Sequence, residues 1–405
     1  MRGGACLDVA SHRSRYLRAA VGLGGAMAAL FVGFLVWSGL PVGVSSRVVR
    51  ESYPAISPDG PGYVTVTDFF RGEDVVLDRS RVSRPLVPLL ALPLSYVVPT
   101  ELSYIVVNAA LFLLLVGAFF GLAEHLLGTA QHGFYATVLL IFSFPVYYRG
   151  INVTVDLASW LIFVVMARVL VELERRGAVR LSTFTVLSAL CGLATLVTEL
   201  VFSSFLLVLS FYLIRRRRQC RPLRLVADLG TMAAAAGAVV LLLQATIYLV
   251  FDYGFFEQLQ RQVVWFSENP LNLGLAGFVR VLVGAFLVSL LLVPVGLLDL
   301  RQSMQDRELA AAMLVAALLT LLAVYTHSIR FVFVLFPVVF PIAVLGVVRL
   351  AGIGGAVFGL GRRGTLAIEV ALLSGVCAIN VATYAGVLRY GSTIEMARRL
   401  LPFLL

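Results

Sequence analysis

The sequence contains no lysine, so all 32 basic residues among its 405 positions are arginine. We draw no function from this bias, because the base composition of a genome produces it as readily as chemistry does. Charge of either sign is also scarce, at 13% of residues, whereas 60% are hydrophobic and the mean hydropathy is +0.96. These values lie far outside those of soluble globular domains. The scarcity of charge therefore excludes a soluble protein and indicates a polytopic membrane protein.

Cysteine is scarce as well. The four cysteines, Cys6, Cys191, Cys220 and Cys377, lie far apart, with no CxxC pair and no histidine spaced to join them. Disulfide frameworks and zinc sites depend on such spacings. The cysteines therefore predict neither a disulfide scaffold nor a metal site.

Acidic residues number only 22, which leaves a net charge of +10. A basic protein can bind nucleic acid, but these arginines sit in short loops between apolar segments. Arginine in such loops sets membrane orientation and meets anionic headgroups. We therefore predict the lipid bilayer as a partner and no nucleic-acid binding.

The first apolar run covers residues 17–39. Its roughly 23 residues are long enough for a helix that rises about 1.5 Å per residue to cross a hydrocarbon core of about 30 Å. We interpret it as a retained signal anchor in the plasma (inner) membrane with a cytoplasmic N-terminus. Residues 40–101 then form an extracytoplasmic loop.

The segment 85–98 decides the rest of the topology. Its 14 residues make only about 21 Å of helix, and Pro88 and Pro93 would break that helix further. We predict a re-entrant or surface helix, because a crossing here would turn every later arginine-rich loop outward, against the positive-inside rule. Residues 389–405 resemble an interfacial tail.

The predicted fold is therefore all-α, a polytopic transmembrane helical bundle forming one integral-membrane domain over residues 1–405. The first loop would contain short helices. About 11 spans are expected, at residues 17–39, 102–124, 134–148, 153–171, 181–197, 200–214, 225–251, 278–298, 309–325, 331–349 and 365–388.

Asp59 is the first candidate for chemistry. It lies in a turn rich in proline and glycine, where a backbone can approach a ligand closely, and Tyr63 follows four residues later. A carboxylate beside an apolar wall outside the membrane can have its pKa raised enough to act as a general base. The local sequence fits a simple turn residue better, since Pro-Asp-Gly is common in turns.

Two more acids, Asp156 and Glu199, lie within or at the edge of apolar spans. Carboxylates there cost about 2.5–3.5 kcal/mol on insertion scales and usually face a cavity or a partner. A functional site and a structural ion pair, with Arg149 or Arg330 as partner, explain them equally well.

Four basic residues on the same predicted face, Arg81, Arg84, His327 and Arg330, are suited to binding phosphate. Arginine presents a planar fork to phosphate oxygens and keeps its charge. A single arginine of this kind would more simply anchor a helix end at the headgroups. The three candidate acids on the same face favour a site.

These motifs together resemble the GT-C-type polytopic membrane glycosyltransferases that depend on polyprenyl-phosphate sugars. The resemblance rests on Asp59-Gly60-x-x-Tyr63 and on Arg-x-x-Arg-Pro-Leu-x-Pro-Leu-Leu-Ala over residues 81–91. It continues, in order, through Phe144-Pro145 ahead of Asp156, Thr198-Glu199, and Arg330-Phe331 ahead of Leu335-Phe336-Pro337.

The resemblance implies an inverting hexosyl or pentosyl transferase of the cell envelope, with Asp59 as catalytic base. Basic residues such as Arg84 and Arg330 would hold the phosphate of a polyprenyl-phosphate-linked sugar, for an unknown acceptor. No cofactor is firmly implied, and a divalent metal ion stays open. The alternatives are a transporter or lipid flippase that uses Asp156 and Glu199, and a non-catalytic scaffold subunit with a GT-C-like fold.

Overall fold

The computed structural model describes residues 3–37, 59–77, 79–217, 219–254, 275–324 and 328–390, with the single positions 257, 260 and 264. Within these ranges every regular element is a helix, which confirms the all-α prediction. The elements are α1 (Gly3–Trp37), α3 (Gly60–Phe70), α4 (Arg79–Val82), α5 (Leu86–Ser95), α6 (Thr100–Leu127), α7 (Ala130–Ile141), η1 (Val146–Gly150), α8 (Asp156–Arg175), α9 (Leu181–Ala194), η2 (Glu199–Val201), α10 (Phe202–Arg216), α11 (Pro222–Phe251), α13 (Leu275–Phe286), α14 (Ser289–Ser303), α15 (Arg307–Val324), α16 (Ile329–Val332), η4 (Phe333–Leu335), α17 (Phe336–Val357) and α18 (Arg362–Tyr390).

Five described helices are long and apolar enough to cross a bilayer by length and composition. They lie at Ser11–Leu35, Thr100–Leu127, Pro222–Phe251, Ile329–Val357 and Arg362–Thr383. The finer count of about 11 spans stays a prediction. Two of the predicted spans are not single helices. Within 134–148, α7 ends at Ile141 before η1 begins at Val146, and within 278–298 the chain breaks between α13 and α14 at Leu287, which has φ 46°. The left-handed backbone conformation of Leu287 interrupts the helix, although the apolar run of the sequence continues.

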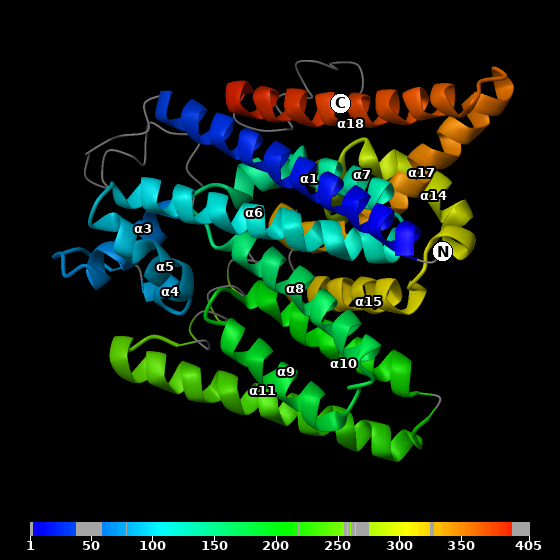
Figure 1. Ribbon diagram of the computed structural model, residues 1–405. Helices are drawn as coiled ribbons and strands as arrows, with labels where there is room; N and C mark the ends of the chain where they lie inside the picture. The colour runs from blue at the N-terminus through cyan, green and yellow to red at the C-terminus, as the bar shows by residue number, and fades with distance from the viewer. Residues whose placement is uncertain are drawn as a thin grey trace.

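Helix α6 packs against several other helices of the bundle. It begins after Pro99, whose extended backbone cannot continue a helix, and ends at Gly128, whose φ of 75° gives a left-handed cap. Its 28 residues correspond to about 42 Å. Helices α1, α7 and α8 pack against it (Figure 1).

The short helices α3, α4 and α5 gather at one end of this bundle (Figure 1, left). Helix α5 falls inside the segment 85–98 and has ten residues, about 15 Å, which is half the thickness of a hydrocarbon core. Pro93 lies inside it. The backbone N–H of Leu86 donates to the carbonyl of Leu196 at 3.2 Å, which ties the start of α5 to the chain before η2.

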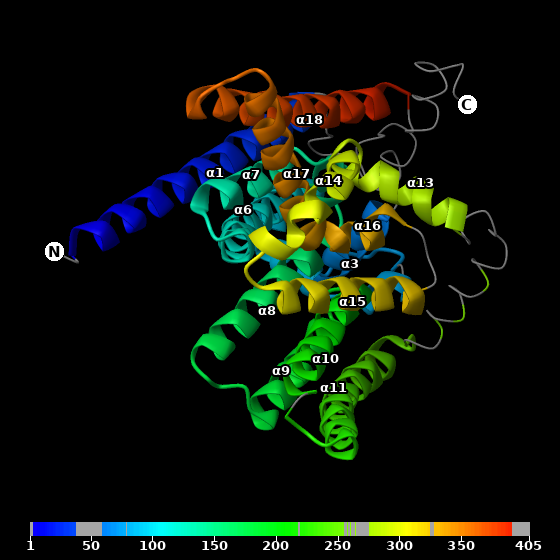
Figure 2. The ribbon, with the colours of Figure 1, turned by 90° about the vertical axis from the view of Figure 1, so that its right-hand side faces the viewer.

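Helix α17 crosses the interior of the bundle, as Figure 2 shows. Its first turns contribute Phe336 and Phe340 to a group of rings that also contains Phe333 and Phe286. Trp160 of α8 packs edge-on to Phe333 at 4.7 Å between ring centroids. These buried rings fix the position of the chain that carries Arg330, three residues before Phe333.

Candidate functional site

Asp59 lies at the N-terminal end of α3 between two guanidinium groups. Its Oδ1 accepts a hydrogen bond from Nη2 of Arg81 at 2.6 Å, and its Oδ2 accepts one from Nη1 of Arg330 at 3.1 Å. The three residues come from α3, α4 and α16. Both carboxylate oxygens therefore contact cations from parts of the chain up to 271 positions apart.

Arg84 forms a second connection at the same end of the bundle. Its side chain is only 3% exposed and donates to the hydroxyl of Tyr63 at 3.0 Å and to Oε1 of Glu199 at 2.7 Å. The other oxygen of Glu199 accepts from the hydroxyl of Thr198 at 2.9 Å. The guanidinium of Arg81 lies over the ring of Tyr63, 5.5 Å from its centroid. Tyr63 thus contacts both arginines.

Asp156 lies behind Arg330. It is the first residue of α8, is 2% exposed, and has Oδ1 at 3.9 Å from Nη1 of Arg330. The N-terminus of a helix favours a negative charge. The guanidinium of Arg330 also lies 4.9 Å from the ring centroid of Phe331, and Trp160 donates to the backbone carbonyl of Arg330 at 3.2 Å. Arg330 therefore lies between Asp59 and Asp156.

Local backbone chemistry explains why these polar groups converge. The side-chain amide of Asn108, buried in α6, donates to the carbonyls of Asn152 at 2.5 Å and Thr154 at 3.0 Å. This holds the irregular chain between η1 and α8, whose carbonyls would otherwise be buried without donors. At Glu199, the hydroxyl of Thr198 caps η2.

Arg149, on the π-helical turn η1, was not predicted as a site residue. Together with Arg81, Arg330 and Arg84 it is one of the cations that act on the carboxylate of Asp59. Its position four residues after Pro145 and ahead of Asp156 was the only sequence signal, and that signal fitted a structural partner equally well.

The electrostatics of Asp59 differ from the prediction. Burial alone would raise the pKa of Asp59, but Arg81, Arg330, Arg149 and Arg84 together hold this pKa below its ordinary value. The prediction that an apolar wall raises the pKa is therefore wrong here. The physical reason is that the folded chain brings guanidinium groups from distant segments around one carboxylate, and charge–charge attraction outweighs desolvation.

In the ion pair of Arg84 and Glu199, charge–charge attraction likewise outweighs the effect of burial on the pKa. Burial would raise the pKa of Glu199, yet Arg84 and Arg330 hold it below the ordinary value. Burial would lower the pKa of Arg84, but Glu199 raises it above the ordinary value. Both groups are therefore charged in this structure.

Seven of the eight predicted site residues lie in this one cluster. They are Asp59, Tyr63, Arg81, Arg84, Asp156, Glu199 and Arg330. His327 lies outside the described residues, as do positions 40–58 of the first loop and the predicted tail beyond residue 390. The roles predicted for these residues stay predictions.

A metal-binding role has no cluster to support it in the described ranges. There, no group of three or more histidine, cysteine, aspartate or glutamate side chains gathers where it could hold an ion. The acids of the site contact arginine instead, as at Asp59 and Glu199.

No protein-family model and no curated protein matches this sequence. Among solved structures, the chain is similar to the crystal structure of ArnT from Cupriavidus metallidurans bound to undecaprenyl phosphate. The TM-score is 0.51 at 14% identity, over 91% of this chain and 73% of that one. At this identity the similarity is one of fold. The chain is therefore an integral membrane protein with the fold of the GT-C-type glycosyltransferases.

Proposed function

We propose that this protein is a membrane glycosyltransferase that moves a sugar from a polyprenyl-phosphate donor to an acceptor at the extracytoplasmic face. The observation that carries the proposal is the arginine cluster around Asp59, which is an anion site within a GT-C fold. The crystal structure of the similar protein ArnT contains undecaprenyl phosphate, a ligand whose phosphate matches this chemistry.

The phosphate of the donor would take the place that the carboxylate of Asp59 now occupies. Arg81 and Arg330 each direct a guanidinium N–H at that carboxylate, at 2.6 and 3.1 Å. A phosphate diester presents an anionic oxygen pair of similar spacing, and arginine binds both anions with the same fork geometry. Donor binding therefore competes with the ion pairs of Asp59.

This exchange supplies the base that the reaction needs. Once the phosphate engages the two arginines, the carboxylate of Asp59 loses its partners, and its pKa rises from its depressed value toward the ordinary one. Asp59 then accepts the proton of the acceptor hydroxyl. A carboxylate held in strong ion pairs is a poor base. Binding of the donor therefore raises the pKa of Asp59 and makes it a better base.

The transfer itself is a single displacement. The acceptor oxygen attacks the anomeric carbon while the bond from that carbon to the phosphate oxygen breaks, and the polyprenyl phosphate leaves with the bonding electrons. The configuration inverts, because attack and departure occur on opposite faces of the sugar. Arg81 and Arg330 stabilise the charge that develops on the departing phosphate.

The test compares Asp59→Asn with Asp74→Asn, an exposed acid between α3 and α4, in purified full-length protein. We expect Asp59→Asn to lower transfer from a polyprenyl-phosphate sugar by about 10²–10⁴-fold, the usual contribution of a general base. Donor binding should be kept or tightened, because the competing carboxylate is gone. Near-normal transfer by Asp59→Asn would reject Asp59 as the base.

One observation favours a second candidate, a non-catalytic scaffold subunit. Both oxygens of Asp59 are engaged by arginine, as they would be if the cluster only held α3, α4 and α16 together. In that case a polyprenyl phosphate should not bind at the cluster. Arg330→Gln would then change stability while leaving lipid-phosphate binding unaltered, whereas a transferase loses donor affinity.

A further inference from the structure

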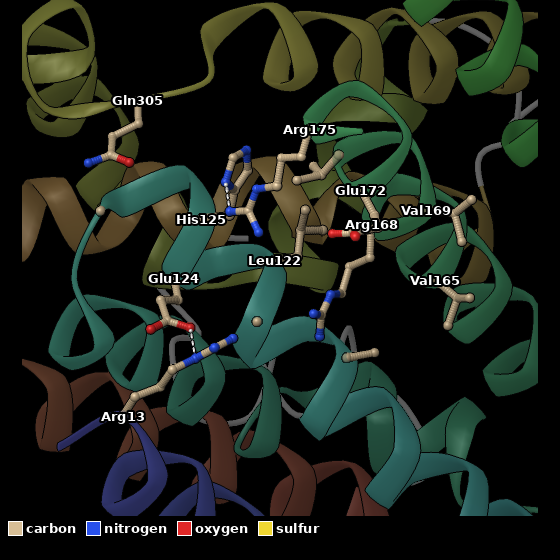
Figure 3. A pocket seen from close by; sticks show the side chains of 14 residues that line it. Arg13, Leu122, Glu124, His125, Val165, Arg168, Val169, Glu172, Arg175 and Gln305 are labelled. Carbon is tan, nitrogen blue, oxygen red and sulfur yellow. Dashed lines mark hydrogen bonds and ion pairs between the residues drawn. The ribbon is translucent and has the colours of Figure 1, made fainter. Parts of the chain in front are cut away.

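A second polar region lies at the opposite end of the bundle. A cavity of about 620 Å³ opens there, lined by residues of α1, α6 and α8 (Figure 3). Helix α6 connects the two polar regions. Near its start, the hydroxyl of Tyr104 donates to the backbone carbonyl of Tyr63 beside the first site, and near its end His125 lines the cavity. Those 21 positions of helix correspond to about 32 Å, close to the thickness of a hydrocarbon core.

Two guanidinium groups at this cavity have no carboxylate partner within the described part of the chain. Arg168 forms no ion pair there, and Arg175 donates only to Nδ1 of His125, at 3.2 Å. The Nε2 of His125 lies 3.3 Å from Asp306. A third arginine, Arg13, is paired with Glu124 at 2.8 Å.

The neighbouring charges are matched elsewhere. In the adjoining cavity, Arg215 contacts three carboxylates, those of Glu174, Asp306 and Glu308. Arg176 pairs with Glu172 at 2.6 Å on the exposed surface. Among the arginines that line this cavity, Arg168 and Arg175, both toward one end of α8, are thus the two with no carboxylate oxygen within 4 Å in the described residues.

The shape of α6 makes room for Arg168. A Cβ added to Gly121 would lie 2.7 Å from Cζ of Arg168, so the guanidinium rests on bare helix backbone. With any larger residue at position 121, the side chain of Arg168 would have to move. Gly117, one turn earlier in α6, has nothing within 4 Å of its added Cβ.

The cavity also has an apolar side. Val165, one turn before Arg168 in α8, is 43% exposed and lines the cavity with Ala118 and Leu122 of α6. The cavity therefore joins an apolar wall to two guanidinium groups that have no carboxylate oxygen within 4 Å in the described residues.

We propose that this cavity binds the phosphate headgroup of an anionic phospholipid, with its acyl chain along Val165. Basic pockets between transmembrane helices at the cytoplasmic side bind such headgroups. The arginine-rich loops of this chain lie at this end, where the positive-inside rule places the cytoplasm. The site is independent of the proposed transferase reaction, because it lies across the bundle from Asp59.

The test measures retention of phosphatidylglycerol by the full-length protein, with phosphatidylcholine as the zwitterionic comparison, by native mass spectrometry. We expect Arg168→Gln and Arg175→Gln each to lower the affinity for phosphatidylglycerol about fivefold, the usual effect of one basic residue near a membrane surface. Arg180→Gln, which removes the same charge at an exposed position outside the cavity, should leave it unchanged. Equal weakening by Arg180→Gln would overturn the proposal.

A second pair of variants keeps every charge. Gly121→Ala should lower phosphatidylglycerol affinity by displacing Arg168, and Gly117→Ala should not. We expect both to retain the fold, since the three atoms nearest to the added methyl at 121 all belong to the end of a flexible side chain. Equal affinity in the two alanine variants, or displacement of the lipid by millimolar glycerol phosphate, would contradict a lipid headgroup site.

Discussion

At the scale of single residues, Arg84 and Glu199 form a largely enclosed ion pair in the first site. Their side chains are 3% and 20% exposed, and the N–O distance is 2.7 Å. Removing one partner of a buried pair leaves an uncompensated charge and typically costs about 3–5 kcal/mol. Replacing both partners avoids that penalty.

We therefore expect Arg84→Met to lower the melting temperature in detergent more than the double variant Arg84→Met/Glu199→Gln does. Thermal unfolding of the wild type, both single variants and the double variant gives the coupling energy. Additive losses, with the double variant the least stable, would show that the two side chains do not depend on each other.

Asp59 gives a prediction about pH. Arginine neighbours lower its pKa in the folded state, so the ionised carboxylate stabilises the fold. This contribution is complete above the unfolded pKa of about 3.9 and is lost as the pH falls through the lower folded value. The stability difference between wild type and Asp59→Asn should be constant near pH 6–8 and should shrink below about pH 4. Thermal unfolding at several pH values measures it. A difference that grows toward low pH would contradict the ion pairs.

At the scale of elements, the close approach of α14 and α17 depends on glycine. A Cβ at Gly346 would collide with the carbonyl oxygen of Leu292, which is backbone and cannot move aside cheaply. Gly352, in the same helix, has nothing within 4 Å. Gly346→Ala should therefore lose about 1–3 kcal/mol of stability, the usual cost of overpacking. Gly352→Ala is the matched control, and its unfolding temperature should equal or exceed that of the wild type.

The apolar runs of the sequence predicted the helices well, because a backbone within a membrane must satisfy its own hydrogen bonds. The short helix in 85–98 followed from its length and from Pro93. The break at Leu287 did not, since its left-handed backbone lies within a continuous apolar run. The π-helical turn at 146–150 was likewise not predicted. The irregular chain that follows this turn is held by a partner distant in sequence, the Asn108 amide.

The members of the first site could be named from sequence, but their pairing could not. The positive-inside rule placed Asp59, Glu199 and Arg330 on one face, and in the structure they share one cluster. Which arginine faces which acid depends on helix rotation and on side-chain packing, and a loop sequence encodes neither. The sign of the pKa shift at Asp59 was missed for this reason.

At the scale of the whole molecule, the two polar regions lie at opposite ends of the helices. The loop after α3 and the loop after α8 should then face opposite sides of the membrane. We expect a cysteine at Asp74 to react with an impermeant maleimide from the outside of intact cells, and a cysteine at Arg176 to react only after permeabilisation. Both positions are exposed. The background should lack Cys6, Cys191, Cys220 and Cys377. Equal labelling of both positions in intact cells would contradict this orientation.

The exclusive use of arginine around Asp59 has a consequence for the working range of the protein. A guanidinium group keeps its proton at any pH a cell meets, whereas a lysine amine in the same position could lose it. The positive charge that these guanidinium groups offer to an anion is therefore constant from mildly acidic to strongly alkaline pH. Within the described part of this cluster, sensitivity to acidic surroundings therefore comes from its carboxylates or from the molecule that it binds.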